Sequence, residues 1–172
     1  VYGILKTQRS LALAALLLGC MAVEFAQAEC GEAPKHWISM KKAQVVLRAN
    51  NQDTLELPVR IAETDSQRRG GFQGVCPELI RNWSILFVFH KDVTAEFHMR
   101  RVAEALDIAF FGADGNVLGI QTMQPLSVTK TDRRYRANEP FRFALETSAG
   151  RLNQVTQNPT RWRLLDLNFD AQ

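Results

Sequence analysis

The sequence predicts one mostly β domain of the α+β kind. We expect a small barrel-like or sandwich-like domain of short antiparallel strands with one or two short helices. Its 172 residues, 46% of them hydrophobic and 23% charged, suit a single globular domain. Several short segments alternate apolar and polar residues with a period of two, as half-buried strands do. Between two of them stands Asp114-Gly115, a dipeptide that favours a hairpin turn.

Six segments have the composition of strands: residues 55–61, 83–89, 106–111, 117–120, 141–145 and 163–169. Pro58 lacks an N–H, so the first of them should be an edge strand or carry a bulge. Residues 83–89 are almost entirely apolar, which predicts a strand buried on both faces. Many short strands with few helices favour a small barrel or sandwich.

Two short helices are expected between these strands. Thr64 precedes Gln67 by three residues, which is the spacing of a capping box, and Gly70-Gly71 should end that helix after one or two turns. A second short helix is predicted within residues 147–154.

The first 28 residues have the pattern of a cleavable signal peptide. Lys6 and Arg9 precede an uncharged core at residues 11–18, which is too short to span a bilayer. Ala26-Gln27-Ala28 is the small-x-small sequence that a signal peptidase recognises, with cleavage before Glu29. The alternative is a lipoprotein signal at Leu17-Leu18-Gly19-Cys20, in which Cys20 would carry a lipid anchor.

The predicted organisation is therefore a signal peptide at 1–28, a tether at 29–43 and one β-rich domain at 44–172, located in the periplasm or secreted. No transmembrane segment is expected in the mature chain. Cleavage before Glu29 leaves two cysteines, Cys30 and Cys76, and an even number in an oxidising compartment predicts a disulfide.

Several function classes are disfavoured by composition and motifs. A formal charge of +3 and a single short basic run, Arg133-Arg134-Tyr135-Arg136, do not suit a nucleic-acid binder. The cysteines and histidines are too scattered for a zinc site. The sequence has no nucleophile elbow, phosphate loop, dinucleotide fingerprint or zinc-protease motif. We therefore assign no catalytic residues, no cofactor and no metal.

A family resemblance rests on motifs in a fixed order over residues 55–168. They are Ala62-Glu63-Thr64 with Arg68, Gly71 and Phe72, then Leu86-Phe87-Val88-Phe89, Phe97-His98-Met99-Arg100, Leu106-Asp107-Ile108-Ala109-Phe110, Asp114-Gly115, and Ala144-Leu145-Glu146 with Gly150. In this order they resemble the bacterial and archaeal domain-of-unknown-function family 192. The resemblance implies a compact, β-rich, barrel-like domain with short helices. It implies no reaction, because that family has no agreed activity.

One motif departs from the family pattern, which usually reads Phe-Trp-Met-Lys-Asn-Thr and, a few residues later, Pro-Leu-Asp. Phe97, Met99, Leu106 and Asp107 match it. The Trp, Lys, Asn, Thr and Pro positions hold His98, Arg100, Arg101, Val102 and Ala105. The apolar frame is retained and the polar set differs, as expected of a divergent member with a partner of its own.

The candidate ligand-binding residues are Glu96, His98, Arg100 and Asp107. On a strand through residues 95–101 the first three would share one side, opposite Phe97 and Met99. Such a stripe can move a proton or hold an anionic group. The alternative is a solvated face with weak ion pairs.

Asp107 stands between Leu106 and Ile108 in an apolar segment. An unpaired buried carboxylate is costly, so Asp107 should be exposed, paired with an arginine, or bonded to backbone amides. It is either an anchor of the hairpin or a functional acid. Glu146 and Arg68 are further candidates of the same kind.

Three functions remain open. The first is a non-enzymatic envelope module that binds a small ligand or a protein through the surface around His98. The second is a small exported enzyme that uses His98 with Glu96 or Asp107 as acid and base. The third is an accessory subunit that docks onto a larger envelope complex through an exposed apolar surface.

Overall fold

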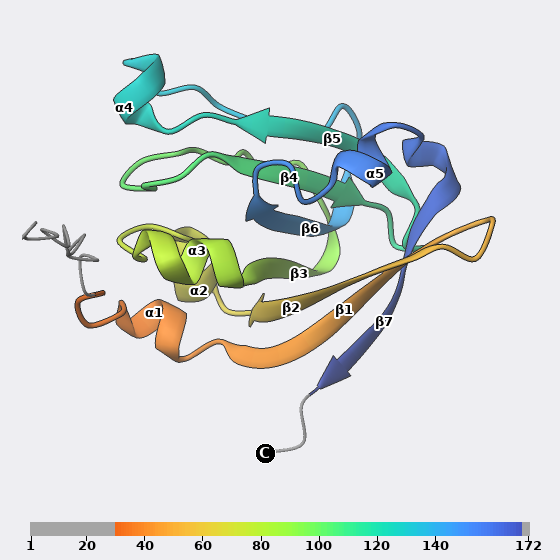
Figure 1. Cartoon of the computed structure of the whole chain (residues 1–172), viewed down its shortest axis with the longest axis horizontal. Helices are drawn as coiled ribbons and strands as arrows, with labels where there is room; N and C mark the ends of the chain where they lie inside the picture. Colours follow the sequence, from red (N-terminus) through yellow and green to blue (C-terminus); the bar gives the residue numbers. More distant parts are fainter. Residues whose placement is uncertain (1–29, 170–172) are drawn as a thin grey trace, which may run out of the picture.

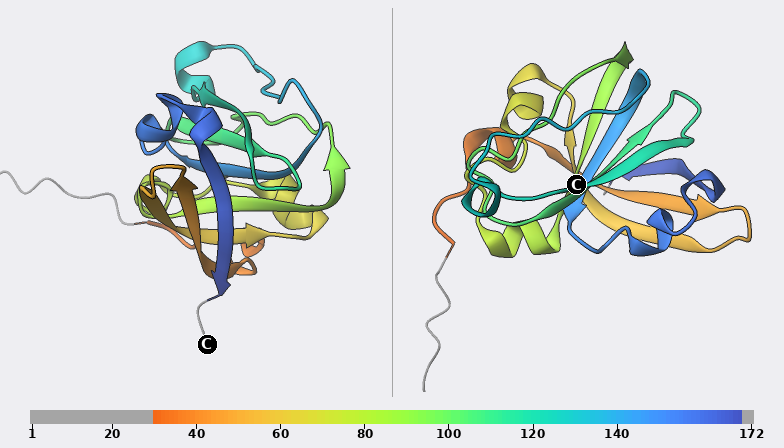
Figure 2. Two further views of the ribbon diagram at one scale, coloured as in Figure 1. Left: turned by 90° about the vertical axis from the view of Figure 1, so that its right-hand side faces the viewer. Right: turned by 90° about the horizontal axis from the view of Figure 1, so that it is seen from above.

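The computed structural model describes residues 30–169, apart from the side chains of residues 160 and 165–169, so the predicted signal segment with Cys20 lies outside it. One seven-stranded sheet curls into a nearly closed barrel (Figures 1 and 2), which confirms the predicted fold class. The strands are β1 (Lys41–Ala49), β2 (Thr54–Ala62), β3 (Ser84–Val93), β4 (Leu106–Phe111), β5 (Val117–Met123), β6 (Phe141–Ser148) and β7 (Trp162–Phe169). The helices are α1 (Lys35–Ile38), α2 (Asp65–Gly70), α3 (Pro77–Asn82), α4 (Leu126–Thr129), α5 (Asn153–Thr156) and the 3-10 turn η1 (Pro159–Arg161).

The strand order is β5-β4-β6-β3-β2-β1-β7, and every pair is antiparallel except β2 with β3. The two end strands approach each other where the β4–β5 turn meets β7. There Asn116 forms a bridge with Arg163, and the Leu164 N–H donates to the Gly115 carbonyl at 2.8 Å. This contact nearly closes the barrel.

Apolar side chains lie on both faces of the sheet. One buried cluster lies among the strands themselves and includes Val45, Leu57 and Leu145. The other lies where α1–α3 and the segment 97–102 pack on β3, β4 and β6, and it includes Phe87 and Phe110. Figure 1 shows α1, α2 and α3 gathered at one end of the sheet. The central strands are therefore covered on both sides.

Most predicted elements are present. The apolar run at 83–89 forms most of β3, the hairpin around Asp114-Gly115 joins β4 to β5, and residues 141–145 and 163–169 lie in β6 and β7. Pro58 is not on an edge strand, since β2 lies between β1 and β3. However, β2 pairs with β3 only from Val59 onward, so at Pro58 the strand has a neighbour on one side only. The missing N–H is tolerated there.

The capping box is confirmed. The Gln67 N–H donates to Thr64 Oγ1, and Gln67 Oε1 accepts from the Thr64 N–H at 3.0 Å. Gly71 ends α2 with a φ of 48°, which a glycine adopts readily. The helix expected within 147–154 is shorter and later, because β6 continues to Ser148 and α5 begins at Asn153. No helix among residues 30–169 is long and apolar enough to cross a membrane.

The prediction of a tether at residues 29–43 is wrong for residues 30–43, which are the part of it that the structure describes. Residues 35–38 form α1, and β1 begins at Lys41. Trp37 is 1% exposed and its ring lies 5.3 Å from that of Phe72. The Arg60 guanidinium lies 5.1 Å from the Trp37 ring. A single helical turn shows no periodicity, so the sequence pattern could not reveal that this segment packs on the domain.

Candidate functional site

A pocket of about 520 Å³ opens between α2 and the segment 95–98, over β3 and β6. Its volume is in the range of small-ligand sites, roughly 300–1,000 Å³. Charged and polar side chains surround the mouth, and phenylalanines with one carboxyl group form the deeper part. The lining residues are Asp65, Arg68, Arg69, Gly70, Gly71, Gln73, Phe87, Phe89, Ala95, Glu96, Phe97, His98, Arg134 and Glu146.

Glu146 supplies the buried carboxyl group of this pocket. It is 5% exposed and pairs in register with Ile85 on β3 and Ile108 on β4, so its closest neighbours across the sheet are apolar. Among the described side chains it has no hydrogen bond and no ion pair. Burial without a partner disfavours the charged form and raises the pKa of Glu146 to about 8. At neutral pH the group is mostly protonated and can donate a hydrogen bond.

The pocket wall is aromatic. Phe87 and Phe97 meet edge to face with centroids 5.1 Å apart, and Phe89 packs in the same way against Phe141 at 5.6 Å. The backbone of Gly71 lies close to both the carboxyl and the wall: a Cβ there would meet Phe87 at 3.5 Å and Glu146 Oε2 at 3.6 Å. Glycine at this turn therefore leaves the carboxyl group accessible from the pocket.

Arg68 holds α2 against the sheet. Its guanidinium donates to the carbonyls of Glu63 at 2.6 Å and Val88 at 3.0 Å, and to Asp65 Oδ1 at 2.6 Å. The same group lies 5.3 Å from the ring centroid of Phe89. Since these contacts use much of its donor capacity, Arg68 shapes the pocket more than it offers a free charge.

The expected polar stripe is partly at the pocket. Residues 94–96 and 98–99 are not in a strand, and Phe97 makes only a single bridge with Tyr135. The predicted alternation is nevertheless present, because Phe97 and Met99 are buried while Glu96 and Arg100 are exposed and His98 is half-buried. Glu96 and His98 line the pocket, whereas Arg100 does not. His98 Nδ1 accepts a hydrogen bond from the Arg100 N–H at 3.4 Å.

Arg100 instead belongs to a charged cluster beside the pocket. It binds Asp132 through two nitrogens, and Arg134 reaches the same carboxylate at 3.4 Å. The hydrogen bond from Arg100 lowers the pKa of Asp132, so this carboxylate stays charged. One aspartate therefore serves two arginines, and Arg134 keeps donors for another anion.

Asp107 lies on the opposite face of the sheet from Glu146. Glu146 shares a face with its register partner Ile108, and the neighbouring residue on a strand points the other way. Asp107 accepts from the Thr122 hydroxyl at 2.8 Å and from the Gly150 N–H at 2.7 Å. Of the three environments expected for Asp107, the bond to a backbone amide is the one present, and these contacts tie β4 to β5 and to the turn after β6.

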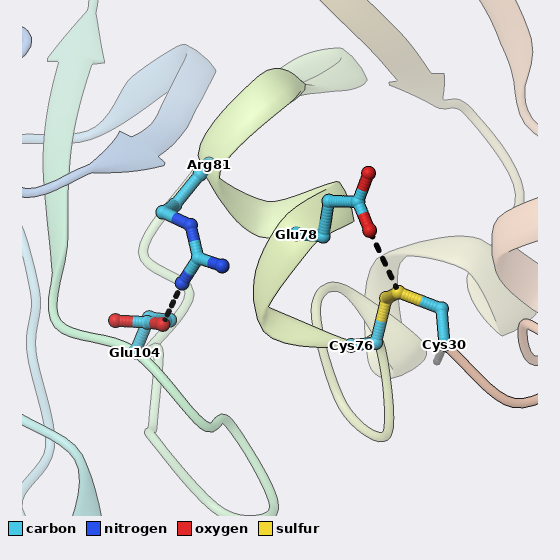
Figure 3. Close-up of a disulfide and its surroundings, with 5 residues drawn as sticks. All are labelled: Cys30, Cys76, Glu78, Arg81 and Glu104. Carbon is cyan, nitrogen blue, oxygen red and sulfur yellow. Dashed lines mark hydrogen bonds and ion pairs between the residues drawn. A yellow bond between two sulfur atoms is a disulfide. The ribbon is translucent and has the colours of Figure 1, made fainter. Parts of the chain in front are cut away.

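The disulfide between Cys30 and Cys76 is present and fastens the N-terminal segment to the start of α3 (Figure 3). Glu78 lies beside it, with Oε2 3.7 Å from the Cys30 sulfur. The ion pair between Arg81 and Glu104 joins α3 to the segment before β4. In the part of the chain that the structure describes, no three His, Cys, Asp or Glu side chains gather as a metal site.

The sequence favoured Asp107 over Glu146 as a site residue. It did not indicate Arg69 or Arg134 as ligand-binding residues. The sequence signal for Glu146 is weak, because it shares a face of β6 with Ala144 and lies opposite the larger apolar residues Phe143 and Leu145. Only the packing of α2 and residues 95–98 over that face shows that it is buried.

Two solved structures resemble the fold closely. A candidate transcription regulator from Sinorhizobium meliloti 1021 is 25% identical with a TM-score of 0.65, over 78% of this chain and 97% of that one. A protein of unknown function from Novosphingobium aromaticivorans DSM 12444 is 20% identical with a TM-score of 0.65, over 81% of this chain and 94% of that one. No curated protein sequence matches the chain. The family model DUF192, described as "Uncharacterized ACR, COG1430", matches residues 45–159, and the chain therefore belongs to the DUF192 family.

Proposed function

We propose that this domain is a non-enzymatic module that binds a small ligand in the Glu146 pocket. The observation that carries the proposal is the unpaired carboxyl group of Glu146, which is 5% exposed and lines an aromatic pocket. The Glu146 oxygens have no protein partner among the described residues and face the pocket, since Arg60 Nε is the fully buried side-chain atom without a partner in that part of the chain. A few polar groups on an apolar wall are also typical of small-ligand sites. A bound ligand would supply the missing partner.

A protein-docking role is the alternative, and the exposed apolar residues give it less support. Among the described residues, the large exposed hydrophobic side chains are Ile38, Leu126 and Val128. They lie on α1 and α4, which Figures 1 and 2 show well apart. A docking surface of several hundred Å² would be expected to be contiguous. The Glu146 pocket therefore supports a binding function better than these separate apolar residues support docking.

The acid–base hypothesis requires His98 to be joined to Glu96 or Asp107. Neither pair is among the hydrogen bonds of the described residues, and Asp107 is engaged on the other face of the sheet. For this reason we place binding before catalysis.

A ligand screen by thermal shift tests the proposal. The full chain would be screened at pH 7 against anionic, neutral and cationic metabolites beside two variants. Ala95→Phe fills the pocket from its wall, and Thr94→Phe adds the same ring at an exposed neighbour that does not line the pocket. A ligand at 100 times its Kd should add about 2.7 kcal/mol, which raises Tm by several degrees. The shift should vanish in Ala95→Phe and persist in Thr94→Phe; equal shifts in both variants would place binding elsewhere.

We also propose that the domain acts in the periplasm or is secreted. The signal-like pattern of residues 1–28 supports export, and a disulfide between Cys30 and Cys76 suits an oxidising compartment. N-terminal sequencing of protein from fractionated bacteria tests this. A start at Glu29 in the soluble periplasmic fraction is expected. A lipid-modified start at Cys20 would support membrane anchoring, and an intact segment 1–28 in the cytoplasm would refute export.

A further inference from the structure

Resting on the ligand-binding role proposed above, we infer that the pocket takes a small organic anion with an oxygen acceptor at its far end. The anionic group meets Arg69 and Arg134 at the mouth. The apolar body lies along the phenylalanine wall. The distal oxygen, a carbonyl or hydroxyl, accepts a hydrogen bond from Glu146.

The mouth has more positive than negative groups. The lining acids are Asp65 and Glu96, and both already have arginine partners: Asp65 binds Arg68 at 2.6 Å, and Glu96 lies 3.8 Å from Arg136. Arg69 is 76% exposed and reaches Asp65 only at 3.9 Å. Its guanidinium is therefore largely available to a ligand.

Arg134 is the second available cation. Its side chain is 41% exposed, and its carboxylate partner Asp132 is bound mainly by Arg100. Arg69 and Arg134 approach the pocket from different segments, α2 and the loop before β6. Guanidinium groups bind carboxylates and phosphates through paired hydrogen bonds, so two of them at one mouth favour an anion.

The floor of the pocket suits the uncharged end of such a ligand. Ile85 and Ile108 flank Glu146, and no cation is bound to its carboxyl among the described side chains. A protonated carboxyl group donates a hydrogen bond and does not repel an anion held at the mouth. The floor of the pocket therefore suits an acceptor oxygen of the ligand and does not suit a second negative charge.

The aromatic wall is less suited to a cationic ligand. Cation–π recognition needs a free ring face, and Phe89 is already covered by the Arg68 guanidinium at 5.3 Å. Phe87 and Phe97 meet edge to face, which uses one ring face for the other's edge. A third cation near Arg68 and Arg69 would also be repelled.

Three probes of similar size separate these requirements: 4-acetylbenzoate, 4-isopropylbenzoate and 4-acetylbenzylamine. They would be titrated into the full chain by calorimetry at pH 7. We expect 4-acetylbenzoate to bind about tenfold more tightly than 4-isopropylbenzoate, which cannot accept the hydrogen bond from Glu146. The amine should bind most weakly. Arg69→Gln/Arg134→Gln should weaken both benzoates by about tenfold, whereas the exposed Arg48→Gln should not.

A pH series then identifies the group at the floor. Above pH 8 the ionised carboxylate of Glu146 cannot donate, so the affinity of wild type for 4-acetylbenzoate should fall with rising pH. Glu146→Gln retains an N–H donor without a titrating group, so its affinity should be constant across the series. Glu146→Leu should bind 4-acetylbenzoate no better than 4-isopropylbenzoate.

The experiments distinguish failure of the anionic ligand class from failure of the pocket as a binding site. Tighter binding of 4-acetylbenzylamine, with an affinity that rises through pH 8, would overturn the anion and leave the pocket as a ligand site. Absence of binding by the two benzoates at millimolar concentration would also overturn the anion class. Loss of the pocket role itself would appear instead as ligand shifts that Ala95→Phe does not remove.

Discussion

Glu146 on β6 is the register partner of Ile108 on β4, so a carboxyl group and an isoleucine share one buried face of the sheet. Ile85 occupies the matching position on the other neighbouring strand. The charged form of Glu146 would lose its hydration there without gaining a partner, which is why burial raises its pKa from 4.5 to about 8. Folding therefore takes up a proton between these two pH values.

This proton uptake makes stability depend on pH. A raised pKa means that the native state holds the proton where the unfolded chain has lost it. The free energy of unfolding should therefore fall as pH rises from 4.5 to about 8, at up to about 1.4 kcal/mol per pH unit. Glu146→Gln removes the titration and should show a flatter profile, so that its stability relative to wild type improves toward pH 8. Urea denaturation at several pH values measures both profiles.

Glu96→Gln is the matched control, because Glu96 lines the same pocket but is exposed. Its profile should follow that of wild type. Parallel profiles for Glu146→Gln and wild type would show that the carboxyl group of Glu146 is ionised in the native state at neutral pH.

The position of Glu146 shows where sequence reasoning stops. Alternation in residues 141–145 correctly predicts a strand, and it places Ala144 and Glu146 on the face opposite Phe143 and Leu145. In the structure Ala144 and Glu146 are buried, because α2 and the segment around Phe97 cover that face. A period of two identifies which residues share a face; it does not say whether a distant segment covers it.

Asp107 is expected to be structural, and its removal should reduce stability. Asp107→Ala leaves the Gly150 N–H and the Thr122 hydroxyl without their acceptor, at a cost of about 2–4 kcal/mol. Asp107→Asn keeps one acceptor oxygen and should cost less. Urea denaturation at pH 7 measures both.

Asp92→Ala is the control for Asp107, since Asp92 is an exposed strand aspartate that pairs with Arg142 at 3.0 Å. An exposed pair contributes about 0–1 kcal/mol, so this change should have little effect. If Asp107→Ala were as mild as Asp92→Ala, the anchoring role of Asp107 would be wrong.

The disulfide should contribute strongly to stability. Cys30 and Cys76 are 46 residues apart, and in the chain-entropy model such a closed loop is worth about 4 kcal/mol. Cys30→Ser/Cys76→Ser should lower the urea midpoint by a corresponding amount, which the fluorescence of the three tryptophans reports. Reductant should lower the wild-type midpoint to that of the double variant and leave the variant unchanged. A wild type that is insensitive to reductant under unfolding conditions would show that the bridge is not formed.

The fold was more predictable than the site because its signals are local. The capping box at Thr64 and the turn at Asp114-Gly115 each depend on a few adjacent residues, and both are present. The pocket depends on contacts between α2, β6 and residues 95–98, which are far apart in sequence. The prediction of an N-terminal tether was wrong for the same reason. The burial of Trp37 depends on contacts with Phe72 and Arg60, which are distant in the sequence.

The contact that nearly closes the barrel should depend on the glycine at position 115. Gly115 has a φ of 81°, and a Cβ there would lie well inside van der Waals contact with the Leu164 carbonyl. Gly115→Ala should therefore strain the turn and separate it from β7, with a loss of about 1–3 kcal/mol. Gly119→Ala is the control on the adjoining strand, where a Cβ meets nothing within 4 Å, and it should be close to neutral. Hydrogen exchange reports the local effect, because the Leu164 N–H donates to the Gly115 carbonyl and should lose protection only in Gly115→Ala. Equal protection of the Leu164 amide in both variants would mean that the turn accommodates the extra methyl group and that β7 does not depend on this contact.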